Sequence, residues 1–224
     1  MLAEDYLYHE YGDISTSINK GTTVALIVGI IKKASPHFKK ARINNQIKES
    51  LNENELTQIF VEQVDMQIRK ARLPFGVKNQ YSDIFYGTRG IPDFYFHRLD
   101  EGKTSIALFI VESKRLPAPP PKEREKEYVI GPNHNGGIER FKNGSHGKGL
   151  TECGMLGFVE QQNFNFWHVT INNWIGVLAK ADKEWNLVEL LKLIETISDY
   201  CYLISLVIRR ADDKLNLHHL WIKA

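Results

Sequence analysis

Apolar residues in the first third of the chain recur at the spacing of helices with one buried face. Residues 22–34 form a first stretch, which Pro36 interrupts, and residues 53–72 form a longer second one. Asn52 stands where the second helix would begin, and Glu55 occupies the position that completes a capping box. The apolar stripe of this helix consists of Leu56, Ile59, Phe60, Val64 and Ile68. We therefore expect two helices in this part of the chain.

Aromatic and β-branched residues then take over between clusters of turn residues. Residues 81–86, 91–98 and 105–112 each have the composition and length of a strand, and glycines or charged turns separate them. Every position from Ile106 to Val111 is apolar, which indicates a strand that is covered on both faces. The pattern predicts three antiparallel strands, the third of them inside the sheet.

Residues 117–150 interrupt this regularity with proline, glycine, lysine, asparagine and histidine. A connection of this length is typical of a functional or mobile loop, and only residues 138–142 favour a short helix. Beyond the loop, the pattern predicts a fourth strand, two amphipathic helices and a β-hairpin. These elements are expected at residues 155–160, 164–179, 184–197, 201–209 and 215–222.

The elements together predict an α/β fold, and the composition allows it. The chain has 224 residues, of which 42% are hydrophobic and 25% charged, as is usual for folded globular proteins. A single domain over residues 1–224 is expected. Its parts would be an N-terminal helical extension at 1–50, a core at 51–160 that contains the mobile loop, and C-terminal helices with a β-hairpin at 161–224.

Apolar runs and cysteines indicate the cellular setting. The strongly apolar stretch near the N-terminus, residues 24–31, is far shorter than the roughly 18 residues of a membrane span. Cys153 and Cys201 form no CxxC pair and no Cys/His ladder at zinc spacing. We expect a cytoplasmic protein in a reducing environment.

Charge is nearly balanced over the whole chain. The formal net charge is +2, so any binding of nucleic acid must come from local clusters. Residues 32–48 contain six basic residues and no acidic one. This cluster fits either a solvated helix face or a phosphate-binding patch, and the sequence leaves both interpretations open.

Three charged residues fall at the ends of two predicted neighbouring strands. Asp93 follows Pro92 at the start of one strand, and Glu112 and Lys114 lie at the end of the next. A turn centred on residues 102–103 would place Asp93 opposite Glu112. The two-residue repeat of a strand puts Lys114 on the same face as Glu112. The three side chains are therefore expected to meet at one end of the sheet.

Two carboxylates in such an apolar setting favour a bound cation, because it is costly to bury like charges together. Oxygen ligands favour Mg²⁺ or Mn²⁺ over zinc. The sequence therefore predicts a site for Mg²⁺ or Mn²⁺ between Asp93 and Glu112.

A Pro-Asp pair at the start of one strand and Glu-x-Lys at the end of the next resemble the motif of the restriction-endonuclease-like PD-(D/E)xK nuclease superfamily. The resemblance covers residues 52–160 and implies a core of order αβββαβ, a mixed central sheet flanked by helices. It implies Asp93, Glu112 and the backbone carbonyl of Ser113 as metal ligands. Lys114 would orient the attacking water and offset charge in the transition state.

Junction-resolving members of the superfamily place a further glutamate on the first helix, within a Glu-x-Glu-Leu pattern. The sequence has this pattern at residues 53–56. The resemblance therefore implies Glu53 as a further metal ligand. Two other glutamates lie on the same predicted helix. Glu55 would serve the helix cap, and Glu62 lies two turns further along the helix.

Four residues outside this trio are candidates for substrate binding. Arg140 and Lys142 lie on the short helix where related nucleases place a basic residue near the scissile phosphate, although ordinary surface charges would also fit. His146 is a candidate phosphate contact, and its glycine-rich surroundings lack the spacing of a nucleotide-binding loop. Gln161 ends the fourth predicted strand, where it would contact substrate or cap a turn.

The resemblance implies a Mg²⁺-dependent endonuclease, with double-stranded DNA as the expected substrate and a role in restriction or anti-phage defence. A homodimer or a larger defence complex fits double-strand cleavage, since two symmetric sites match two strands. The alternative is a catalytically inactive module that binds nucleic acid or assembles with partners on a nuclease-like fold.

Overall fold

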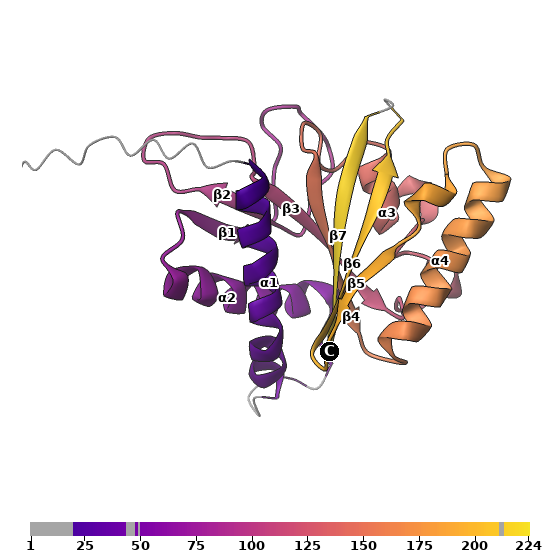
Figure 1. Cartoon of the computed structure of the whole chain (residues 1–224), viewed down its shortest axis with the longest axis horizontal. Helices are drawn as coiled ribbons and strands as arrows, with labels where there is room; N and C mark the ends of the chain where they lie inside the picture. The colour runs from indigo at the N-terminus through magenta and orange to yellow at the C-terminus, as the bar shows by residue number, and fades with distance from the viewer. Residues whose placement is uncertain (1–19, 44–47, 49, 211–212) are drawn as a thin grey trace, which may run out of the picture.

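A mixed seven-stranded sheet runs through the molecule in the order β1-β2-β3-β4-β7-β6-β5 (Figure 1). The computed structural model describes residues 20–43, 48, 50–210 and 213–224. Strands β1 to β3 form an antiparallel meander, β4 and β7 continue parallel to β3, and β6 and β5 return antiparallel. The strands are β1 Phe75–Asn79, β2 Phe94–Arg98, β3 Phe109–Leu116, β4 Glu152–Val159, β5 Lys192–Thr196, β6 Tyr200–Ile208 and β7 Lys214–Lys223.

Helices cover both faces of this sheet (Figure 1). The helices α1 and α2 pack on one face, and α3 and α4 pack on the other. Their bounds are α1 Lys20–Arg42, α2 Glu53–Ala71, α3 Gly137–Lys142 and α4 Phe164–Ala181, with short 3-10 turns η1 Lys122–Arg124, η2 Pro132–His134 and η3 Leu187–Glu189. In the described part of the chain, no helix is long and apolar enough to cross a membrane.

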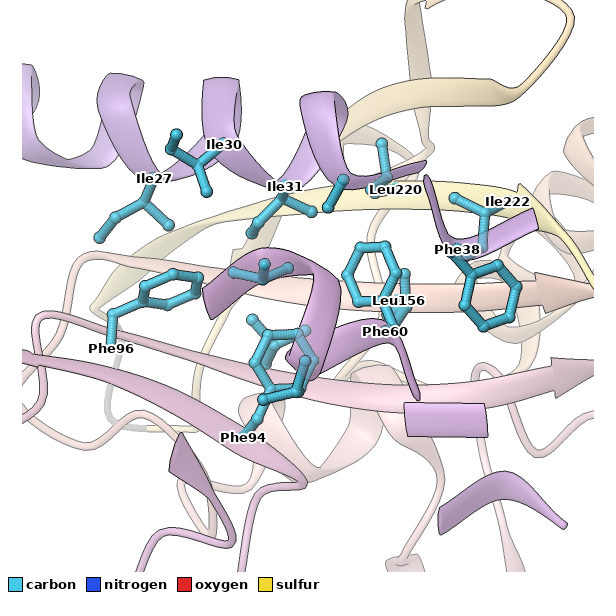
Figure 2. Packing of buried hydrophobic residues seen from close by; sticks show 14 of the residues in the cluster. Ile27, Ile30, Ile31, Phe38, Phe60, Phe94, Phe96, Leu156, Leu220 and Ile222 are labelled. Atoms are coloured by element: carbon cyan, nitrogen blue, oxygen red, sulfur yellow. The ribbon is translucent and has the colours of Figure 1, made fainter. Parts of the chain in front are cut away.

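The core under α1 and α2 is built from alternating strand residues and from the buried stripes of the two helices. Figure 2 shows Phe94 and Phe96 of β2 beneath Phe60 of α2, with Ile27 and Ile31 of α1 above the sheet. Neighbouring strand residues point to opposite faces of the sheet. In β7, Leu220 and Ile222 lie in the core under α1 and α2, whereas Trp221 between them lies in the core on the other face. Both faces of the central strands are therefore buried, as the apolar run in β3 predicted.

Helix α1 continues past Pro36 to Arg42, so the predicted break at this proline is wrong. A proline inside a helix removes one backbone hydrogen bond and costs about 3 kcal/mol. Here Phe38, two residues on, is fully buried between Phe60 and Phe158, with ring centroids 5.9 and 5.6 Å away. This packing offsets the lost hydrogen bond. Residues 1–19 of the expected N-terminal extension lie outside the described residues.

The first predicted strand, at residues 81–86, is also wrong. The strand that pairs with β2 lies earlier, at Phe75–Asn79. Asp83 explains the difference, because its carboxylate accepts hydrogen bonds from the backbone N–H groups of Phe85 and Tyr86 and folds the segment into a turn. Similarly, β3 begins at Phe109, four residues after the predicted start.

The predicted helix at residues 184–197 is a 3-10 turn, η3, followed by the edge strand β5. Pairing with β6 satisfies the backbone of this segment, with Lys192 opposite Ile204 and Thr196 opposite Cys201. Tertiary pairing thus overrides its helical spacing. Helix α4, strand β4 and the β6–β7 hairpin lie where the sequence placed them, within a few residues.

The segment at residues 117–150 is largely folded against the sheet. It contains η1, η2 and α3, and it buries Tyr128, Val129, Ile138 and Phe141. From α2 to β4 the order is helix, antiparallel three-strand meander, short helix and a strand parallel to β3. The start of β2, the middle of β3 and the start of α2 meet in this part of the fold.

Candidate active site

The candidate site lies where β2 begins, beside the middle of β3, which continues to Leu116. Phe94 pairs with Val111 across these strands, which is the register that the sequence predicted. The same register, continued by one residue, places Asp93 beside Glu112. Asp93 Oδ2 accepts a hydrogen bond of 2.6 Å from the backbone N–H of Ser113. The aspartate is thereby attached to the strand that carries the other two residues.

Lys114 is the centre of the cluster. Its buried ammonium lies 2.9 Å from Glu112 Oε1, 3.0 Å from Glu53 Oε1 and 2.7 Å from the carbonyl oxygen of Ser113. Burial alone would lower the pKa of Lys114, but the attraction of Glu112, Glu53 and Asp93 outweighs burial and raises this pKa. Lys114 is therefore held in its charged form.

Glu112 is fully buried, and both of its oxygens are hydrogen-bonded. Oε1 accepts from Lys114 and, at 2.7 Å, from Arg140 Nη1, while Oε2 lies 3.0 Å from His146 Nε2. An ionised carboxylate only accepts, so His146 Nε2 must carry the proton. Burial would raise the pKa of Glu112, but Lys114, His146 and Arg140 lower this pKa to about 2. Glu112 is therefore the carboxylate that remains ionised.

Asp93 has the opposite electrostatic setting. Burial and then the repulsion of Glu112 raise the pKa of Asp93 to about 7, although Lys114 and the Ser113 N–H act against this shift. Its second oxygen, Oδ1, makes no hydrogen bond within the described residues. The cluster therefore holds more carboxylate than its own cations neutralise.

Glu53 completes the cluster from the first turn of α2. The helix cap uses its neighbours instead, because Asn52 and Glu55 form a reciprocal capping box and Glu55 also pairs with Lys48. Glu53 Oε2 accepts from the backbone N–H of Arg115 at 3.1 Å, and its Oε1 accepts from Lys114. Burial raises the pKa of Glu53 despite the attraction of Lys114. Of the three glutamates considered on this helix, the structure brings this one to the cluster.

Arg140 reaches Glu112 because α3 packs closely against β3. At the start of this helix, a side chain on Gly136 would collide with the backbone of Ile130, and one on Gly137 would contact Met155 and Lys114. The Arg140 guanidinium is also hydrogen-bonded to the carbonyl of Asn135 at 2.9 Å. Gly137 is thus the sequence signal for the close approach of α3 to the sheet.

Two predicted substrate-binding residues lie away from this cluster. The ammonium of Lys142 is buried on another side of α3, where it donates to Glu189 at 2.6 Å and to the carbonyl of Ile208 at 2.9 Å. Gln161 is exposed beyond the end of β4, and its backbone carbonyl accepts from Trp167. Lys142 is therefore committed to a structural ion pair, because helix geometry directs residues two positions apart to different faces.

His146, the candidate phosphate contact, is buried beside Glu112. Its side chain is 1% exposed, and its backbone N–H is bonded to the carbonyl of Arg140. Its Nδ1 is one of the buried atoms without a hydrogen-bond partner in the described part of the chain. Its contact with Glu112 spans 34 residues of sequence, so local pattern could not reveal it.

The donor set has the chemistry of a Mg²⁺ or Mn²⁺ site. Asp93, Glu112 and the Ser113 carbonyl offer oxygen atoms, and burial together with the repulsion of Glu112 disfavours a negative charge on Asp93 unless a cation is near. Among the described residues, no group of three or more His, Cys, Asp and Glu side chains is arranged to hold a metal ion. Both Glu112 oxygens are occupied by Lys114, Arg140 and His146. To bind a metal ion, Glu112 would have to give up a hydrogen bond to one of these partners.

Comparisons of the chain with protein-family models, with curated proteins and with solved structures find no match. Its function must therefore be inferred from the site itself.

Proposed function

We propose that this protein is a Mg²⁺-dependent nuclease of the PD-(D/E)xK type, which hydrolyses phosphodiester bonds in DNA. The observation that carries the proposal is the meeting of Asp93, Glu112 and Lys114 at the junction of β2 and β3, with more carboxylate than cation. The order of elements from α2 to β4 supports it, because it follows the αβββαβ order that the resemblance implies.

Each residue of the cluster has a chemical role in hydrolysis. Lys114 is held charged, so it can offset the negative charge that develops on the attacked phosphate and can orient the water that attacks phosphorus. Arg140 is partly exposed above Glu112 and offers a guanidinium to a phosphate oxygen. His146 donates to Glu112 and fixes its orientation. The reaction adds water across the P–O bond and leaves a phosphate monoester and a hydroxyl.

Asp93, Glu112 and the Ser113 carbonyl would hold the metal, and Glu53 is a further candidate ligand. When bound, Mg²⁺ supplies Lewis-acid stabilisation of the phosphate charge. The ionised form of Asp93 is needed for this role, and a divalent cation nearby would favour that form. Surrounding residues exclude bulk water, since Glu112 and Lys114 are both buried.

The proposed biological setting is DNA cleavage in restriction or anti-phage defence, with a homodimer as the form that cuts both strands. A catalytically inactive DNA-binding module is the rival function. A structural ion-pair network would be expected to balance its charges, whereas Asp93 is left without a full complement of partners. This imbalance favours an enzyme.

The test is cleavage of supercoiled plasmid, linear duplex and single-stranded DNA with Mg²⁺, with and without EDTA. We expect Mg²⁺-dependent nicking that falls at least about 100-fold in Lys114→Ala. Asp93→Asn is the second variant. It should fold at least as well as the parent, because it removes a repelling charge, and it should also lose cleavage.

Lys192→Ala is the matched control, since this exposed lysine lies on the edge strand β5 at the far side of the sheet. It should cleave like the parent protein. The proposal fails if no DNA form is cut in a metal-dependent way, or if folded Asp93→Asn cuts as fast as the control. Binding of DNA by the parent without cleavage would support the rival function.

A further inference from the structure

An apolar loop projects beside the candidate active site. It lies between β1 and β2 at residues 82–91, and it ends two residues before Asp93. Four of its large apolar side chains face solvent, with Ile84 72%, Phe85 43%, Tyr86 41% and Ile91 54% exposed. Exposed apolar side chains that are gathered in one loop are typical of a contact surface.

The loop is held in a fixed conformation. Its base continues the β1–β2 pairing, because the N–H of Gln80 donates to the carbonyl of Asp93 at 2.7 Å and that of Tyr81 to Pro92 at 3.1 Å. Within the loop, the Asp83 carboxylate accepts from the N–H groups of Phe85 and Tyr86 and, at 2.8 Å, from the Thr88 hydroxyl. These hydrogen bonds lower the pKa of Asp83, while its burial acts in the opposite direction.

The loop also packs against the segment that carries His146. A side chain on Gly90 would collide with His146 Nδ1, and one on Gly149 would collide with the Tyr86 ring. Lys148 Nζ lies 6.0 Å from the centroid of that ring. The loop is thus packed at Gly90 against the residue that contacts Glu112, and at Tyr86 against the segment that follows His146.

The charges around the tip are basic. Arg89 and Lys148 are exposed, and the only acidic residue in segments 80–92 and 143–150 is Asp83. The carboxylate of Asp83 is occupied by the internal hydrogen bonds of the loop. Aromatic rings flanked by cations match single-stranded nucleic acid, which offers base faces for stacking together with phosphates.

We propose that the loop at residues 82–91 binds unpaired nucleotides next to the scissile phosphate, with a base stacked on Phe85 and with Arg89 and Lys148 contacting the backbone. This inference rests on the proposed nuclease function and names its substrate class as DNA with unpaired bases, such as a bubble within a duplex, in place of the perfect duplex expected from the resemblance. A perfect duplex keeps its bases stacked inside, so it could reach the basic residues but not the ring.

Binding can be measured in EDTA by fluorescence anisotropy, with a labelled single strand, the matching duplex and a duplex that contains an unpaired bubble. We expect the single strand and the bubble to bind more tightly than the duplex. Phe85→Ala should weaken both by about tenfold and leave the duplex unchanged. Phe85→Trp should restore binding, because a larger ring also stacks.

Phe166→Ala is the matched control, because Phe166 is 44% exposed on α4 and so loses a ring of the same exposure elsewhere. It should bind all three probes like the parent. Arg89→Gln should reduce the slope of log affinity against log salt by about 0.7 for the single strand, as expected for one lost phosphate contact. Lys148→Gln should do the same.

The outcomes separate this inference from the nuclease proposal. If the parent cuts DNA but Phe85→Ala binds unpaired DNA as well as Phe166→Ala does, the loop assignment is overturned and the nuclease stands. If unpaired DNA binds through Phe85 but no DNA form is cut, the nuclease is overturned and the binding surface stands. A preference for the perfect duplex, or no binding of DNA by the folded parent, overturns the loop assignment.

Discussion

Two lysines of this protein, Lys114 and Lys142, are buried almost completely, but their electrostatic surroundings differ. Lys142 faces one carboxylate, Glu189, at 2.6 Å, together with the carbonyl of Ile208. Glu189 accepts further hydrogen bonds from the backbone N–H groups of Ile208 and Asn186. One positive and one negative charge are matched, and their remaining hydrogen-bonding capacity is used by the backbone.

Lys114 instead faces three carboxylates, and only part of their charge is neutralised. Arg140 assists at Glu112, whose pKa falls to about 2, whereas the pKa of Asp93 rises to about 7. A matched buried pair holds elements of the fold together and needs no other ion. An unmatched cluster is costly to keep unless it serves a further purpose, which is why the Lys114 cluster is the candidate functional site and the Lys142 pair is not.

The largest effect is expected at the matched pair. Lys142→Ala leaves Glu189 buried without its cation, so the free energy of unfolding should fall by about 3–5 kcal/mol. Urea denaturation followed by circular dichroism measures this loss. Removing both charges in Lys142→Met with Glu189→Gln should recover most of it, since glutamine still accepts from the backbone. A loss below about 1 kcal/mol for Lys142→Ala would show that the pair is not structural.

The cluster of Asp93, Glu112 and Lys114 could be predicted from sequence because it depends on local rules. Strand periodicity placed Lys114 on the face of Glu112, and the hairpin register placed Asp93 across from them, as the pairing of Phe94 with Val111 confirms. Helix-capping rules identified Asn52 and Glu55 as the cap. Strand periodicity and helix capping relate residues a few positions apart, and the hairpin register depends on a single turn. All three can therefore be deduced from the sequence.

The features that the sequence did not reveal share a different cause. Strand β5 was taken for a helix because only pairing with β6 makes it a strand, and the contact of His146 with Glu112 joins segments 34 residues apart. Lys142 was expected at the substrate from its place on the short helix, and its contact with Glu189 joins residues 47 positions apart. Such contacts depend on tertiary packing, which overrides local propensity.

Asp93→Asn tests the unmatched cluster through the pH dependence of stability. The folded pKa of Asp93 is about 7 and its ordinary value is 3.8, so the folded protein holds this proton more tightly than the unfolded chain. The contribution of Asp93 to the free energy of unfolding is therefore greatest below pH 4. Between pH 4 and pH 7 it falls by up to about 1.4 kcal/mol per pH unit. Partial exposure of Asp93 should limit the total to about 2–3 kcal/mol.

The variant should lack this fall and be more stable than the parent above pH 7, with a difference that shrinks toward pH 4. Urea denaturation across this pH range gives both curves. The exposed Asp100→Asn is the control, and its curve should run parallel to that of the parent. Parallel curves for Asp93→Asn would mean that burial and Glu112 do not raise the pKa of Asp93.

The smallest effect, and the most direct link between the cluster and a metal, is stabilisation by the ion. A cation that binds only the folded protein increases the free energy of unfolding by about 1.4 kcal/mol when its concentration is ten times its dissociation constant. For a chain of this size, this increase raises the melting temperature by roughly 4 °C. Mg²⁺ or Mn²⁺ should produce this rise in the parent, and more at pH 8 than at pH 6, because Asp93 must be ionised to bind. Lys142→Met with Glu189→Gln should respond like the parent, since the matched pair lies apart from the cluster. Asp93→Asn should show no rise, and an equal rise in this variant would place any bound metal elsewhere.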